Sequence, residues 1–312
     1  MSLRQMKVAR KRELTPEICE FALEANDGAK LTPFAPGANI TVETPSGAMR
    51  CFSLVNDGYS PNQYVIAVKN EPTSRGGSSS MHKDLEEGSV LNVAAPENSF
   101  TLGDASSYLL IAGGIGITPI YAMAQSLTKD GKPFKIIYCS RSAGDAAYLD
   151  ELKAAFGSNL IAHHDNGDPD NMYDFWDHFA EIKNIHVYCC GPKPLMKEIK
   201  AISGHWPEGR VNFEDFKPVE ISRPDDAAFE VRLQKSAMTI TVPKNQTILE
   251  AVRAAGVPTT SSCEGGACGA CKSSLIEGDV DHRDVVLMEE EKSTNIMICV
   301  SRAKSGGLVI DL

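Results

Sequence analysis

The 312-residue sequence has no apolar run near the roughly 20 residues that a membrane-spanning helix needs. Its first residues, MSLRQMKVARKREL, are basic but lead into no apolar segment, which is unlike a secretory signal and predicts a cytoplasmic protein. A basic surplus is also missing, because the formal net charge is −10. Nucleic acid and anionic membrane are therefore not expected as partners, since both attract basic surfaces.

The chain also lacks internal repeats and low-complexity segments, and it is too long for one ordinary domain. Its first hundred residues resemble short strands separated by turn residues, with no convincing helical period, which predicts a small antiparallel β-barrel. From residue 108 onward, expected strands alternate with expected helices, which predicts a parallel α/β sheet. The expected strands are 39–43, 50–54, 63–69, 108–112, 134–139, 159–163 and 185–189.

A proline-containing acidic stretch predicts a linker before a third domain. Strands are expected at 229–233 and 238–242, followed by a helix whose N-terminus is capped by Thr247 with Glu250 three residues on. The predicted domains are 1–103 for the barrel, 104–217 for the α/β unit, 218–227 for the linker and 228–312 for the third domain.

Four cysteines in this third domain carry the strongest chemical signal in the sequence. Cys263, Cys268 and Cys271 follow the spacing C-x4-C-x2-C, and Cys299 stands alone downstream. This is the spacing of plant-type [2Fe-2S] ligands. The loop sequence CEGGACGAC is rich in glycine, so backbone N–H groups can approach the cluster sulfurs. A zinc site is the alternative, but zinc sites usually use two closely spaced cysteine pairs.

The other five cysteines are expected to fill the core; they are Cys19, Cys51, Cys139, Cys189 and Cys190. Cys190 precedes Gly191 and Pro192 at the end of an expected strand, so it is either a core thiol or a residue beside a bound nucleotide.

A glycine-rich turn after the first α/β strand indicates a nucleotide site. The segment GGIGITP is expected to start a helix with Thr118 as its N-cap and Pro119 as its first residue. A helix N-terminus of this kind can face a pyrophosphate, although tight strand-to-helix turns also occur without ligands. Arg141 ends the next expected strand, and it could also be an ordinary surface arginine.

A second glycine-rich run lies in the first domain. Arg75 is followed by GGSSS, whose N–H and hydroxyl groups could hold a phosphate. Taken alone, this run is more typical of a flexible surface loop.

Taken in order, these motifs resemble the phthalate dioxygenase reductase family, which are reductase components of Rieske-type oxygenase systems. The similarity extends over nearly all 312 residues. It is carried by the segments RCFSL, YVIAVK, RGGS, AGGIGITP, HHDNGDP, VYCCGP, NFEDF, the cysteine loop and ICVSRAKS.

This resemblance implies a ferredoxin-reductase-like barrel that binds FMN, an α/β domain that binds NADH, and a β-grasp ferredoxin domain of α+β type. The implied FMN site is Arg50, Phe52, Ser53, Arg75, Gly76, Gly77 and Ser78, with Phe216 near the isoalloxazine. The implied nicotinamide site is Gly114, Gly116 and Arg141, with Thr118 and Cys190 as catalytic residues. Phe52 replaces the tyrosine of the family motif, so one hydroxyl contact to the flavin is in question.

The predicted function is therefore electron transfer from NADH through FMN and the cluster to the Rieske centre of an aromatic-ring dioxygenase, with phthalate as its substrate. The flavin converts a two-electron donor into one-electron steps. A monomer that meets its oxygenase transiently is expected. Alternatives are a reductase for another Rieske monooxygenase or demethylase, and a non-catalytic iron-sulfur sensor.

Overall fold

A computed structural model describes residues 3–72, 76–216, 223, 225–261, 264–266 and 269–312. The chain divides into two compact units, residues 2–216 and residues 217–312. The first unit holds the predicted barrel and α/β domains, and the second holds the predicted third domain. No helix among the described residues combines the length and the apolar character needed to cross a membrane.

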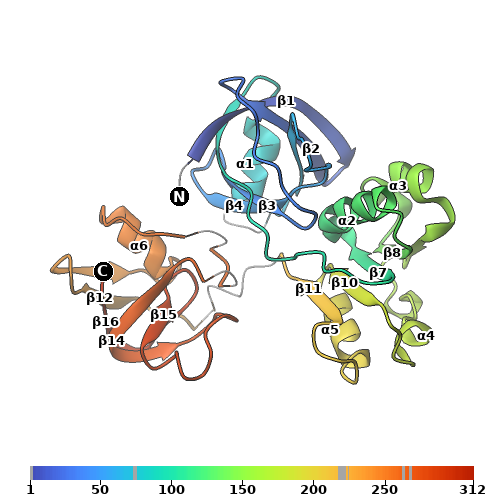
Figure 1. The fold of residues 1–312 in the computed structure, drawn as a ribbon. Helices are drawn as coiled ribbons and strands as arrows, with labels where there is room; N and C mark the ends of the chain where they lie inside the picture. Colours follow the sequence, from blue (N-terminus) through green and yellow to red (C-terminus); the bar gives the residue numbers. More distant parts are fainter. Residues whose placement is uncertain (1–2, 73–75, 217–222, 224, 262–263, 267–268) are drawn as a thin grey trace. The chain divides into compact units, whose positions relative to one another are not determined.

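The first six strands form one antiparallel sheet in the order β4-β3-β6-β1-β2-β5. Figure 1 shows this part of the chain in blue to cyan, with β1 to β4 and helix α1 labelled. A bridge between Leu54 and Ile66 joins the two edges of this sheet, so the sheet closes and the predicted β-barrel is confirmed. The strands are β1 Leu3–Thr15, β2 Ile18–Ala25, β3 Asn39–Glu43, β4 Met49–Ser53, β5 Tyr64–Lys69 and β6 Val90–Ala94.

The barrel also contains a helix that the sequence did not predict. Helix α1 spans Gly77–Asp84 and begins inside the glycine and serine run. Its sequence shows no helical period because only one of its three buried residues is a large apolar residue; the three are Gly77, Ser80 and Met81. Met81 is completely buried in the barrel core, so tertiary packing rather than an amphipathic pattern stabilises this helix.

The α/β part has five parallel strands in the order β11-β10-β7-β8-β9, which confirms the predicted parallel sheet; the strand β11 was not predicted. Helices α2 and α3 cover one face of the sheet, and α4 and α5 cover the other. The strands are β7 Tyr108–Gly113, β8 Phe134–Ser140, β9 Leu160–His164, β10 His186–Cys190 and β11 Val211–Glu214. The helices are α2 Ile117–Lys129, α3 Leu149–Phe156, α4 Trp176–Phe179 and α5 Lys193–Ile202, with 3-10 turns at Gly114–Gly116, Ala143–Asp145, Gly157–Asn159 and Pro169–Asn171.

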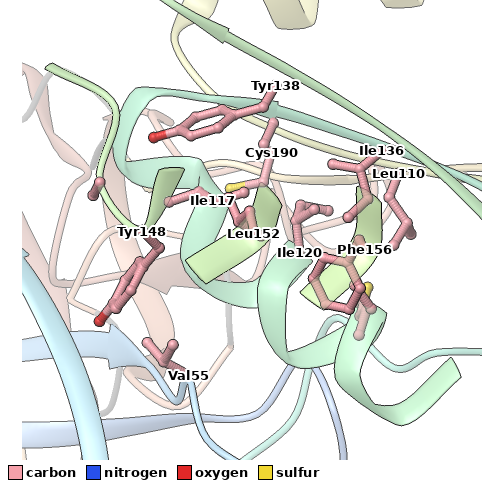
Figure 2. Close-up of a cluster of buried hydrophobic side chains, with 14 of the residues drawn as sticks. Val55, Leu110, Ile117, Ile120, Ile136, Tyr138, Tyr148, Leu152, Phe156 and Cys190 are labelled. Carbon is pink, nitrogen blue, oxygen red and sulfur yellow. The ribbon is translucent and has the colours of Figure 1, made fainter. Parts of the chain in front are cut away.

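One apolar core is shared between the barrel and the α/β part. Val55 of the barrel lies in the same buried cluster as Ile117 of α2 and Leu152 of α3. Figure 2 shows these side chains together. The two predicted domains therefore form a single compact unit, in agreement with the division of the chain.

The second unit is a mixed five-stranded sheet in the order β13-β12-β16-β14-β15, packed against helix α6. Strand β16 pairs parallel with β12 and antiparallel with β14, which agrees with the predicted α+β ferredoxin fold. The elements are β12 Phe229–Leu233, β13 Met238–Val242, α6 Ile248–Ala254, β14 Lys272–Asp281, β15 Asn295–Met297 and β16 Arg302–Ile310. The two predicted strands and the Thr247 capping box are confirmed to the residue.

Candidate functional site

The α/β sheet has its topological switch point between β7 and β10, because the chain runs from β7 outward to β9 and then returns to the other side. Ligands of open α/β sheets bind outside the carboxyl ends of the strands at such a point. Two glycine-containing segments meet there. A Cβ atom added to Gly116 would lie 2.2 Å from the carbonyl oxygen of Cys190, and one added to Gly191 would lie 3.0 Å from the backbone nitrogen of Gly113.

Helix α2 starts two residues earlier than the sequence predicted. Its N-cap is Gly116 and its first residue is Ile117, so the prediction of Thr118 as N-cap and Pro119 as first residue is wrong. The reason is that the 3-10 turn at Gly114–Gly116 continues directly into the helix. The Thr118 hydroxyl donates instead to the carbonyl oxygen of Ile115, 3.1 Å away. The positive end of the helix still lies at the strand edge where a pyrophosphate is expected.

Cys190 is completely buried at the carboxyl end of β10. Figure 2 shows it among the apolar side chains of the shared core. In the sheet it lies between Ala112 of β7 and Glu214 of β11. Burial, followed by the charge of Glu214, raises the pKa of the Cys190 thiol well above its ordinary value. The thiol is therefore neutral, and any role beside a nicotinamide would be one of contact and shape.

Arg141 follows the end of β8 and lines a cavity of about 310 Å³ with Ser142, Asp145, Asn166 and Gly167. Its guanidinium lies 3.3 Å from the Glu17 carboxylate and 3.9 Å from the Asp145 carboxylate. The Asp145 carboxylate also accepts a hydrogen bond of 2.8 Å from the Ser142 hydroxyl. The cavity thus combines one cation with a nearby carboxylate at the carboxyl edge of the sheet.

Two of the predicted flavin residues, Arg50 of β4 and Gly77 at the start of α1, lie against each other. Gly76, the N-cap of α1, has a φ of 86°, a left-handed conformation that glycine adopts readily. A Cβ atom on Gly77 would lie 2.9 Å from Nε of Arg50, so a larger residue there would displace this arginine from the helix start. An arginine beside a helix N-terminus is suited to a phosphate. Ser78 lies in the first turn, where its hydroxyl accepts from the backbone N–H of Glu71.

The rest of β4 also offers groups to a ligand. Ser53 is buried, and its Oγ has no hydrogen-bond partner among the described residues. A buried hydroxyl without a partner is costly, so a bound flavin would fit here by supplying one. Phe52 is half-buried and packs against the barrel core. Phe216, two residues after β11 ends, is 39% exposed and has a ring surface available for stacking.

Two of the four predicted cluster ligands lie at one end of the β14–β15 ladder. Cys271 directly precedes β14, and Cys299 follows β15 by two residues. Because Lys272 pairs with Met297 in this antiparallel ladder, both sulfur-bearing residues are brought to the same end. Both are almost completely buried, at 3% and 1% exposed. Cys263, Cys268 and the predicted phosphate ligand Arg75 lie outside the described residues.

The glycines of the cysteine loop fit a close approach of backbone to cluster. Gly266 and Gly269 have φ values of 76° and 81°, which favour glycine. A Cβ atom on Gly266 would lie 2.8 Å from the Val300 side chain and 3.2 Å from the Cα atom of Asp284. The loop therefore has no room for a larger residue at Gly266, where it packs against Val300 and Asp284.

The structure also reveals a residue to which the sequence assigned no role. Glu214 is half-buried overall, but its Oε2 is buried and has no hydrogen-bond partner among the described residues. Burial raises the pKa of this carboxyl to about 8. Its position in the motif NFEDF was the available signal, but nothing in the sequence showed that β11 pairs with β10 and places Glu214 beside Cys190.

Comparisons with known proteins agree with this geometry. The model of the oxidoreductase NAD-binding domain matches residues 110–201, and that of the 2Fe-2S iron-sulfur cluster binding domain matches residues 231–304. The phthalate dioxygenase reductase of Burkholderia cepacia is 45% identical over 312 residues, which cover 99% of this chain and 97% of that protein. The chain belongs to the phthalate dioxygenase reductase family.

Another member of the family is the phthalate 4,5-dioxygenase oxygenase reductase subunit of Pseudomonas putida. It is 44% identical over a match that covers 98% of this chain and 96% of that protein. A solved phthalate dioxygenase reductase, described as a modular structure for electron transfer from pyridine nucleotides to [2Fe-2S], superposes with a TM-score of 0.89 and 45% identity. That match covers 100% of this chain and 98% of the solved one.

Family membership confirms the predicted class of the protein. It is an oxidoreductase with a ferredoxin-reductase-like first unit and a [2Fe-2S] ferredoxin domain. The predicted cofactor set of FMN, a [2Fe-2S] cluster and NADH is that of the family. The roles assigned to individual residues and the limits of the domains stay predictions.

Proposed function

We propose that this chain is the reductase component of a Rieske-type oxygenase system that acts on an aromatic compound, with phthalate as the expected substrate of the oxygenase. This proposal rests on the 45% sequence identity to a phthalate dioxygenase reductase over 99% of this chain. When bound, the flavin accepts a hydride from the nicotinamide and releases single electrons to the cluster, which accepts one at a time.

The chain's own residues hold and orient these groups. The glycines at 113–116 and Gly191 let the nucleotide approach the backbone at the switch point. Arg50 and the start of α1 supply positive charge to the flavin phosphate. The neutral, buried thiol of Cys190 supports the proposed nicotinamide position from inside the core, where water is excluded.

We further propose NADH rather than NADPH as the donor. The Arg141 guanidinium has the Glu17 and Asp145 carboxylates as near neighbours, at 3.3 Å and 3.9 Å. A 2′-phosphate in this cavity would meet the Asp145 carboxylate, whereas a 2′-hydroxyl could donate to it. An anaerobic titration with each nucleotide, followed by visible spectroscopy, tests this choice. Bleaching of the flavin and cluster at lower NADH than NADPH concentration is expected.

The order of electron transfer is tested by Cys271→Ser, with Cys189→Ser as a matched control. Both thiols are buried, but Cys189 lies in the α/β core and is not a predicted ligand. Cys271→Ser should abolish cytochrome c reduction and spare NADH oxidation by ferricyanide, which the flavin can reduce directly. Cys189→Ser should keep both activities.

Two results would overturn the proposal. Equal loss of both activities in Cys271→Ser would contradict a cluster downstream of the flavin. Anaerobically prepared protein that contains zinc, or that lacks iron and acid-labile sulfide, would contradict the cluster itself. A protein that holds the cluster but is not bleached by NADH would instead be the sensor considered above.

The electron acceptor is inferred from the relatives of this chain. Other family members are reductases of monooxygenase and demethylase systems, so another Rieske-type acceptor is the alternative. Rates of coupled turnover with a phthalate dioxygenase and with a demethylase component distinguish the two. A monomeric, cytoplasmic reductase that meets its oxygenase transiently is also proposed, and sedimentation of the mixture measures that association.

A further inference from the structure

Glu264 lies inside the predicted cluster loop, directly after Cys263 in the sequence. Consecutive Cα atoms are about 3.8 Å apart, so its backbone is next to a predicted cluster ligand. Its side chain is only 10% exposed, and its carboxylate lies 2.6 Å from Nη1 of Arg253. The Ser261 hydroxyl donates to the same carboxylate oxygen at 2.9 Å. A carboxylate is thus held in the loop by one cation and one hydroxyl.

Arg253 belongs to the last turn of α6, outside the cysteine loop. Besides the Glu264 carboxylate, its guanidinium donates to the Ser261 hydroxyl through Nη2. The three side chains therefore form a closed triangle of hydrogen bonds, in which Ser261 is also buried. This geometry fixes both charges relative to the loop.

The backbone of Glu264 shows that the loop tolerates an unfavourable conformation at this position. Its φ is 49°, one of only four positive values among the described non-glycine residues. A left-handed residue that is not glycine persists when its surroundings hold it in place. The Arg253 and Ser261 contacts are such a restraint, which a glycine at this position would not provide.

We propose that Glu264 and Arg253 form a charge-compensated pair beside the [2Fe-2S] cluster, so that neither charge shifts the reduction potential of the cluster while its partner is present. The inference rests on the proposed function, because it requires the cluster. Adding an electron to the cluster is opposed by a nearby negative charge and favoured by a nearby positive charge. While the ion pair is intact, the two effects largely cancel. Removing either partner leaves one uncompensated charge beside the predicted ligands, and the two removals act in opposite directions.

The test uses the full-length holoprotein and measures the midpoint potential of the cluster by anaerobic spectroelectrochemical titration. Glu264→Gln keeps the size of the side chain and an oxygen that can accept from Arg253 and Ser261, so it isolates the charge. We expect its cluster potential to become more positive. Arg253→Gln should make the potential more negative, and the double variant should return close to the parent value.

Two further variants separate charge from structure. Arg253→Lys keeps the positive charge and should stay near the parent potential, even though its single ammonium replaces a two-donor contact. Asp311→Asn removes one charge from an exposed ion pair in the same domain, between Lys235 and Asp311, which are 69% and 34% exposed. Solvent screening should leave the cluster potential of this control unchanged.

The outcomes keep this inference distinct from the proposed function. If the parent protein contains no iron and acid-labile sulfide, the proposed function fails. If the parent cluster is intact but Glu264→Gln and Arg253→Gln shift its potential in the same direction, or not at all, the charge-compensation proposal fails. Loss of iron from Glu264→Gln would also overturn it, because the pair would then hold the loop rather than tune the cluster.

Discussion

Glu214, at the carboxyl end of β11, has a carboxyl whose environment favours its neutral form. Burial raises its pKa from 4.5 to about 8. Between these two values the folded chain holds a proton that the unfolded chain releases. Folding is then favoured less as the pH rises, because the folded state binds more protons. Each unit of pKa difference corresponds to about 1.4 kcal/mol.

We therefore expect Glu214→Gln, which resembles the protonated carboxyl, to flatten this pH dependence. The parent protein should lose stability between about pH 4.5 and pH 8, and the variant should lose less. Urea unfolding of the first unit, followed by flavin fluorescence at pH 5, 6.5 and 8.5, measures the difference. Glu181→Gln, at an exposed position of the same unit, is the control. Parallel pH profiles of parent and Glu214→Gln would contradict a neutral Glu214.

The sequence predicts site residues most directly where their chemistry is encoded locally. The spacing of Cys271 and its loop partners named a cluster before any fold was known, because ligands within one loop are close by necessity. Spacing alone does not show that Cys299 lies at the same end of the β14–β15 ladder as Cys271, because this depends on strand pairing. Glu214 was missed for the same reason.

At the scale of elements, the barrel and the α/β layer are joined by a buried polar contact around Glu20 of β2. Its side chain is 4% exposed and accepts from Nη2 of Arg10 at 2.9 Å and Nη2 of Arg12 at 3.0 Å. The Tyr148 hydroxyl, at the start of α3, donates to it at 2.9 Å. Burial, followed by the charge of Glu20, raises the pKa of the Tyr148 hydroxyl, so this donor stays protonated.

Tyr148→Phe should destabilise the first unit by about 1.5–3 kcal/mol, because a hydrogen bond to a buried carboxylate is lost. Flavin reduction by NADH should also slow, since this contact joins the two parts that carry the predicted flavin and nucleotide sites. Urea unfolding and stopped-flow spectroscopy measure the two effects. Tyr121→Phe is the control, because the Tyr121 ring packs on Tyr148 at 5.3 Å between centroids without a side-chain hydrogen bond of its own among the described residues. Equal effects of the two variants would rule out the hydrogen bond as the cause.

Elements with a local signature were predicted closely, and those stabilised by distant contacts were not. Strand β12 was placed to the residue because its buried and exposed residues alternate, and α6 because Thr247 and Glu250 form a capping box. Helix α1 has no such pattern and depends on Met81 entering the barrel core. The contact of Glu20 with Tyr148 joins residues 128 positions apart, so only the folded chain reveals it.

At the scale of the whole molecule, the end of the predicted linker is anchored to the second unit. The Asp226 carboxylate accepts hydrogen bonds from Nη1 of Arg283 at 3.0 Å and from its Nη2 at 2.5 Å. Both side chains are almost completely buried. Arg302 also lies 3.6 Å away and donates to the Ala227 carbonyl oxygen. The hydrogen bonds from Arg283 lower the pKa of Asp226 to about 2. The predicted limit of the third domain at residue 228 thus leaves Asp226, which belongs to a buried ion-pair network of the second unit, in the linker.

This anchor predicts that the two units can be destabilised separately. Asp226→Asn removes one of the two carboxylates that pair with buried Arg283, and the other, Asp281, stays 2.7 Å away. The loss of this charged hydrogen-bond partner should cost the second unit about 1.5–3 kcal/mol at pH 7. Because residues 2–216 form their own compact unit, their stability should not change. Heating the holoprotein while recording cluster absorbance and flavin fluorescence follows the two units independently. Cluster bleaching should move to a lower temperature while flavin release stays in place, and the exposed-pair variant Asp311→Asn should move neither. A simultaneous shift of both transitions would contradict the independence of the two units.

The depressed pKa of Asp226 also predicts how the stability of the second unit depends on pH. The ion pair stabilises the folded state above about pH 3.8, and this contribution is lost as the pH falls toward 2. The stabilities of the parent and of Asp226→Asn should therefore converge in acid.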